Sequence, residues 1–66
     1  MKAEEFAKNI EYGFLAMNKD CSWRLFHNMP ALDKEKGDWE TLADYFVLQG
    51  IDKSDKDWEQ SLVWCG

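Results

Sequence analysis

The chain has 66 residues, of which 45% are hydrophobic, 32% charged and 15% aromatic, with a formal net charge of −5. This length excludes a two-domain protein, a repeat array and most enzyme scaffolds, because a chain of this size buries only about 60% of the surface its unfolded form exposes. The hydrophobic and charged fractions together argue against disorder. We therefore expect one small domain over residues 1–66, packed around its aromatic rings.

The net charge is unevenly distributed along the chain. Residues 1–30 carry 4 acidic and 4 basic side chains, whereas residues 31–66 carry 9 carboxylates against 4 lysines. Binding to a nucleic-acid backbone or an anionic membrane needs clustered Lys and Arg, so neither partner is expected. The longest apolar run, residues 14–17, is far shorter than the roughly 20 residues of a membrane span. The first residues lack the apolar core of a secretory signal, which predicts a cytoplasmic protein.

The N-terminal segment has helical periodicity. Apolar side chains recur at one helical face, at Ala3, Phe6, Ala7 and Ile10. Gly13 is a natural end for this helix.

The next segment predicts a β-hairpin. Residues 12–17 and 22–27 alternate as strands do, and the polar segment between them favours a turn. A tight turn centred on Lys19 and Asp20 would pair Met17 with Ser22 and Ala16 with Trp23. This register places one apolar set on the core face: Tyr12, Phe14, Ala16, Trp23 and Leu25. The opposite face, with Leu15, Met17, Arg24 and Phe26, is also largely apolar, so it needs either a covering layer or a binding partner.

The C-terminal half has helical spacing in two places. After Pro30, which ends the second strand, residues 31–36 are interpreted as one helical turn. Apolar positions then predict a helix from Asp38 to Gly50: Trp39, Leu42, Ala43 and Phe46.

Residues 44–49 carry an alternative, because Tyr45–Leu48 is β-prone and would suit a third strand after a shorter helix. Residues 54–57 resemble a capping box, which predicts a last helix through Trp58 and Leu62. The expected fold class is α+β: an N-terminal helix, an antiparallel β-hairpin or small sheet, and two C-terminal helices.

Catalytic and metal-binding patterns are missing from the sequence. His27 with Cys21 and Cys65 gives three soft ligands without the paired short spacings of structural zinc. The acidic segment 52–57 lacks the glycine and glutamate of a calcium loop. Neither a nucleophile elbow nor a glycine-rich phosphate loop occurs. We expect no enzyme activity, cofactor or metal, and two free thiols, although a disulfide between the turn and the tail is geometrically allowed.

Two surfaces are candidates for binding. The first is apolar and would contact another protein, including a second copy of this chain; its anchors are Leu15, Met17, Phe26 and Trp64. The alternative is that a helix covers this face. The second surface is acidic and would imitate the phosphates of a nucleic acid: Glu40, Asp44, Asp55 and Glu59. The alternative is that these carboxylates keep an aromatic-rich domain soluble.

Two segments, covering about half of the chain, resemble parts of small phage and prophage proteins of unknown function. Residues 14–30 have their apolar strand, Asp-Lys-Asp-Gly-type turn and aromatic strand ending in Pro, with Cys21 in place of the turn glycine. Trp58, Ser61 and Leu62 match a Trp-x-x-Ser-Leu ending, without the Arg-Pro that follows it. The resemblance implies a non-catalytic accessory protein made in a bacterial cell, acting through protein–protein interaction. An acidic inhibitor that mimics nucleic acid is the alternative.

Overall fold

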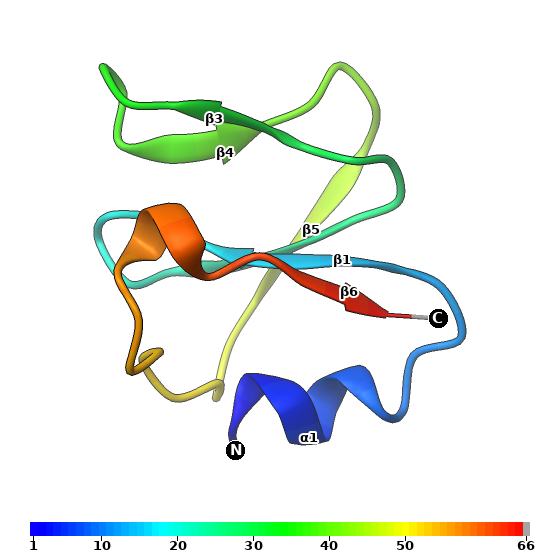
Figure 1. The fold of residues 1–66 in the computed structure, drawn as a ribbon. Coiled ribbons are helices and arrows are strands. Elements are labelled where there is room, and N and C mark those ends of the chain that lie inside the picture. Colours follow the sequence, from blue (N-terminus) through cyan, green and yellow to red (C-terminus); the bar gives the residue numbers. More distant parts are fainter. Residues whose placement is uncertain (66) are drawn as a thin grey trace.

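The architecture is mostly β (Figure 1), in a computed structural model that describes residues 1–65. A four-stranded antiparallel sheet has the order β5-β2-β1-β6, with bounds Tyr45–Leu48, Trp23–Phe26, Gly13–Met17 and Val63–Cys65. A separate antiparallel hairpin consists of β3 (Ala31–Asp33) and β4 (Asp38–Glu40). The remaining elements are α1 (Ala3–Ala7) and a 3-10 helix, η1 (Trp58–Gln60). The helix, the sheet and the hairpin form three layers.

The predicted N-terminal helix is confirmed, but it is shorter than its apolar stripe. α1 ends at Ala7, and Ile10 packs against the core from the following loop. Gly13 is the first residue of β1 rather than a helix stop, with φ +149°, and a Cβ there would lie 3.0 Å from Leu25 Cδ1. In the described part of the chain, no helix has the length and apolarity needed to cross a membrane.

The two predicted C-terminal helices are wrong. The segment 38–50 contains β4 and β5, so the β-strand alternative for Tyr45–Leu48 is the correct one. The apolar spacing is real, but pairing with the outer edge of β2 satisfies the backbone of the β-prone residues, so their β propensity prevails over the helical spacing. The charged segment 31–36 is likewise β3 and a turn, in which Asp33 Oδ1 accepts hydrogen bonds from the N–H groups of Glu35 and Lys36.

The last predicted helix is replaced by η1 and β6. Ser54 does not cap a helix, because its Oγ accepts a hydrogen bond from Lys56 N–H within a loop. One 3-10 turn follows, and the chain then pairs with the free edge of β1 through Val63 and Cys65. If the same register continued, Met17 would lie opposite Ser61. At that position the Ser61 hydroxyl replaces a main-chain carbonyl as the acceptor, because Met17 N–H donates to Ser61 Oγ at 2.8 Å.

The β1–β2 hairpin is confirmed, but its predicted register is wrong by one residue. Asn18 N–H donates to the Ser22 carbonyl at 2.8 Å, so the loop has three residues, and Cys21 closes it with φ +71°. A three-residue loop ending in a left-handed residue is a favoured hairpin connection. Met17 therefore pairs with Trp23, not with Ser22. Because neighbouring residues of a strand face opposite sides, this shift exchanges the two faces of β2 relative to β1.

Both faces of the sheet are covered, as Figure 1 shows, with α1 on one side and the β3–β4 hairpin on the other. The helix-side face, packed against α1, buries Leu15, Met17, Trp23 and Cys65 with Ala3. The hairpin-side face buries Ala16 and Phe26 against Trp39 of β4. The sequence alternative of a covering layer is therefore the one that the fold adopts, with a β-hairpin in place of a helix on the second face.

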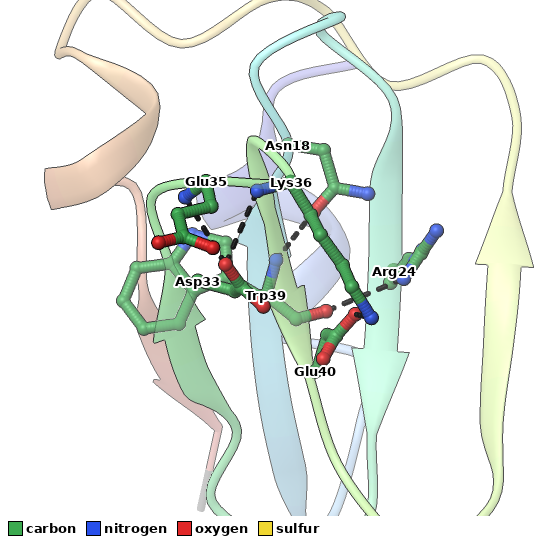
Figure 2. A network of polar contacts seen from close by, with 7 residues as sticks. All are labelled: Asn18, Arg24, Asp33, Glu35, Lys36, Trp39 and Glu40. Atoms are coloured by element: carbon green, nitrogen blue, oxygen red, sulfur yellow. Dashed lines mark hydrogen bonds and ion pairs between the residues drawn. The ribbon is translucent and has the colours of Figure 1, made fainter.

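Buried polar contacts attach the β3–β4 hairpin to the sheet. Asn18 is 3% exposed, and its Oδ1 accepts a hydrogen bond from Trp39 N–H at 2.9 Å (Figure 2). Beside it, Lys19 N–H donates to the Gly37 carbonyl at 2.9 Å. Gly37 has φ +73°, and a Cβ there would lie 3.1 Å from Lys19 Cβ, so glycine permits this close approach. From the other side, Trp39 Nε1 donates to the Trp58 carbonyl at 3.0 Å.

The left-handed conformation of Cys21 predicts that Cys21→Gly stabilises the protein. A side chain in this conformation costs roughly 1 kcal/mol, which glycine avoids, so the free energy of unfolding in urea should rise by up to about 1 kcal/mol. Cys21→Ser is the matched control: it removes the thiol, keeps the backbone cost and should leave stability unchanged. A loss of stability in the glycine variant would contradict the three-residue loop.

The role of Asn18 predicts that Asn18→Ala loosens the hairpin layer. The Trp39 N–H would lose its acceptor in a buried site, at a cost of about 1–3 kcal/mol in the free energy of unfolding. Urea denaturation followed by tryptophan fluorescence measures this cost. Asn9→Ala makes the same substitution in an exposed loop and should change stability by less than about 0.5 kcal/mol. Equal effects at both positions would contradict the anchoring role of Asn18.

Candidate interaction surface

Three of the four predicted apolar anchors lie in the core. Leu15 and Phe26 are 0% exposed and Met17 is 2% exposed, so none of them can contact a partner in this fold. The register also separates them: Leu15 and Met17 lie on the helix-side face, whereas Phe26 lies on the hairpin-side face. The prediction that Leu15, Met17 and Phe26 share one face is therefore wrong, because it depended on a hairpin register that is shifted by one residue from the observed one. Trp64 is exposed as expected, at 68%.

Trp64 ends an aromatic row that crosses the hairpin-side face. On β1, Phe14 lies opposite both Trp64 and Phe26, and Phe26 in turn lies opposite Tyr45. Residues directly opposite in neighbouring strands share a face. The rings of Phe26 and Tyr45 are 5.6 Å apart at their centroids. The row is buried at Phe26 and exposed at both ends, which lie on the two edge strands.

The β5 edge carries the largest run of consecutive exposed apolar side chains in the described residues. Tyr45, Phe46 and Val47 are 41%, 69% and 63% exposed. Sequence reasoning missed this surface because it placed Phe46 on the buried stripe of a helix. The signal that could have found it was the uncharged, β-prone run itself.

Arg24 holds Tyr45 in place and leaves Phe46 free. The Arg24 guanidinium lies 4.7 Å from the centre of the Tyr45 ring, and its Nη1 donates to the Trp39 carbonyl at 3.3 Å. Figure 2 shows this contact between Arg24 and the Trp39 carbonyl as a dashed line. Phe46 points to the opposite face of β5, beyond Leu25. The surface thus combines one oriented ring with one exposed ring.

The four predicted acidic residues do not form a uniform negative surface. They lie on separate segments: Glu40 on β4, Asp44 and Asp55 in two loops and Glu59 on η1. Glu40 pairs with Lys36 at 3.2 Å, and Glu59 pairs with Lys34 at 3.6 Å. Lysines therefore compensate two of the four charges locally.

A different carboxylate cluster forms across the β3–β4 hairpin. Oxygens of Asp33, Asp38 and Glu40 lie within 4.8 Å of one another, a distance at which they could share a hard cation. Lys36 already supplies a positive charge there, at Glu40 (Figure 2). Burial, with Glu40 as the next cause, raises the pKa of Asp38, and Asp38 Oδ1 has no hydrogen-bond partner among the described residues. The cluster is a site of charge repulsion to which we assign no ligand.

The three soft side chains of the chain, His27, Cys21 and Cys65, do not converge. Cys21 lies in the exposed turn and Cys65 is a buried residue of β6, at opposite ends of β1, so these free cysteines are separated by roughly the length of the strand. His27 stacks edge-on against Tyr12, with ring centroids 5.7 Å apart. Burial raises the pKa of the Cys65 thiol, which disfavours the reactive thiolate. In residues 1–65, Asp33, Asp38 and Glu40 form the one group of three metal-type side chains that converge.

Comparison of the chain with known protein families, curated proteins and solved structures found no match in any of the three.

The unpartnered carboxylate predicts that Asp38→Asn stabilises the protein near neutral pH. The folded protein raises the pKa of Asp38, so folding is weakened as the pH rises through that value and the group ionises. The variant should gain a few tenths of a kcal/mol near pH 7, with the gain disappearing below about pH 4. Thermal unfolding across this pH range measures the effect. Asp33→Asn is the matched comparison and should not stabilise, because Asp33 already accepts two turn hydrogen bonds. A neutral or destabilising Asp38→Asn at pH 7 would overturn the repulsion.

Proposed function

We propose that this protein is a non-catalytic accessory protein that acts by binding another protein through the β5 edge, defined by Tyr45, Phe46 and Val47. The observation that carries the proposal is the exposure of these three consecutive apolar side chains on an edge strand. Aromatic side chains are enriched in protein interfaces, and Trp and Tyr are enriched among the few residues that carry most of the binding energy. An exposed apolar edge strand is also a template on which another chain can pair.

The surroundings of the β5 edge support binding rather than catalysis. Within residues 45–51 there is no charged side chain, and the run is flanked by Asp44 and Asp52. In the part of the chain that the structure describes, the one converging group of metal-type side chains, around Asp38, lies on the β3–β4 hairpin and contains three carboxylates beside Lys36. This group contains no histidine, serine or cysteine. A role inside a bacterial cell, as implied by the resemblance to phage and prophage proteins, belongs to the same proposal.

Photo-crosslinking from Phe46 tests the proposal. Benzoylphenylalanine in place of Phe46, expressed in bacterial cells, should give a protein adduct, whereas the same group in place of Leu32 should give none. Leu32 is the matched control because it is an exposed apolar residue on a strand of the other hairpin. The Phe46 adduct should persist in about 0.5 M NaCl, because apolar contacts are not screened by salt.

The salt dependence of binding distinguishes this proposal from a nucleic-acid mimic. Binding by a mimic would weaken steeply with salt and would be lost when Glu40, Asp44, Asp55 and Glu59 are replaced by Gln or Asn. Adducts at both positions, or none at either, would overturn the role of the β5 edge.

A further inference from the structure

The hydrogen-bonding groups on the open side of β5 can be assigned from the ladder. Met17 N–H bonds to Ser61 on the β6 side, and Asn18 N–H bonds to Ser22 on the β2 side. Since alternate residues of an antiparallel strand bond to opposite sides, Ala16 faces β2 and its partner Arg24 faces β1. Trp23 and Leu25 then face β5.

The same alternation sets the direction of each β5 residue. Leu48 and Phe46, the partners of Trp23 and Leu25, bond to β2. Tyr45 and Val47 therefore direct their N–H and C=O groups away from the sheet. None of the turn, loop or side-chain hydrogen bonds in the described residues uses these groups. The open edge of β5 thus has two donors and two acceptors of fixed spacing.

A second copy of β5 matches this pattern in antiparallel orientation. Placing Tyr45 opposite Val47 of the second copy joins the outward groups of both strands through four main-chain hydrogen bonds. In this register Phe46 lies directly opposite Phe46 on the same face, as a non-hydrogen-bonded pair in which side chains approach most closely. Asp44 lies opposite Leu48, so no like charges meet.

Charge permits a second copy at this edge. Each chain carries a net charge of −5, so two copies repel one another except where their surfaces are neutral. Residues 45–51 are uncharged, and β5 contains none of the lysines, prolines or bulges that protect edge strands from pairing.

We infer that the protein forms a two-fold dimer in which β5 pairs with β5, joining two four-stranded sheets into one of eight strands. The inference rests on the proposed function, and it names a second copy as the occupant of the β5 edge. The three exposed side chains bury roughly 300–400 Å² per copy, against about 800 Å² in a standard interface. The dimer is therefore reversible, with a dissociation constant between about 10 μM and 1 mM.

Sedimentation equilibrium over this concentration range tests the dimer. The weight-average mass should rise from 7.8 kDa toward twice that value. Phe46→Glu and Phe46→Lys should each remain monomeric, because like charges would meet at the two-fold axis. An equimolar mixture of the two variants should dimerise again, since Glu then faces Lys. Trp64→Ala alters the other edge strand and should dimerise as the unmodified protein does.

A second variant separates pairing from folding. Val47→Pro removes an outward N–H and should abolish the dimer while keeping the thermal unfolding transition, because proline is tolerated where an edge N–H faces solvent. Phe46→Pro removes an N–H that bonds to β2 and should destabilise the fold.

Two results would overturn the dimer: a constant mass up to about 1 mM, or a charge-swapped mixture that stays monomeric. If the mass stays constant while benzoylphenylalanine at position 46 crosslinks a different protein, the self-pairing fails and the proposed function stands. If crosslinking also fails, both are wrong.

Discussion

The register of β1 against β2 is the constraint on which the rest of the structure depends. It is set by a loop of three residues closed by Cys21 in a left-handed conformation. A strand has two faces and a period of two, so one additional loop residue decides which side chains of β2 join which core. With this register Trp23 joins Leu15 and Met17 under α1, and Phe26 joins Ala16 under the β3–β4 hairpin. That placement determines which layer covers each face of the sheet and which strands form its edges.

A sheet with two apolar faces needs a second layer, and this short chain obtains it through buried polar contacts as well as apolar ones. The Asn18 side chain links the β1–β2 loop to Trp39 of the hairpin layer, and the Ser61 hydroxyl links η1 to β1. Each contact satisfies main-chain groups that would otherwise be buried without a partner. Small domains have little apolar area to spare, so these groups determine where the covering hairpin docks. Because Cys21 and Gly37 adopt left-handed conformations, the β1–β2 loop and the β3–β4 loop approach closely enough for the hydrogen bond between Lys19 and Gly37.

The net charge shapes the outside of the molecule in a different way. Carboxylates concentrate on the loops and on the hairpin, where lysines partly offset them. The side chains of the β5 edge are themselves uncharged, with the Arg24 guanidinium over the Tyr45 ring, and the strand has an open set of main-chain donors and acceptors. Local chemistry therefore divides the surface into a charged part that resists association and a neutral edge that permits it. The exposed aromatic side chains lie mainly at the two ends of the sheet, at Tyr45 and Phe46 on one edge and Trp64 on the other.

Periodicity and turn chemistry were enough to predict the N-terminal helix, the β1–β2 hairpin and the presence of two apolar sheet faces. They failed after residue 30, where apolar residues at helical spacing also included a β-prone run. Helical spacing can be satisfied within a segment, whereas a strand such as β5 exists only when β2 is already beside it. The candidate binding surface was missed for the same reason, since Phe46 lies on a buried stripe in a helix and on an open edge in a strand. The sequence by itself determined a small acidic domain with apolar surface to cover on both faces of a hairpin. The tertiary structure decided which residues cover it and which edge stays open, because strand pairing joins residues far apart in the chain and no local pattern encodes it.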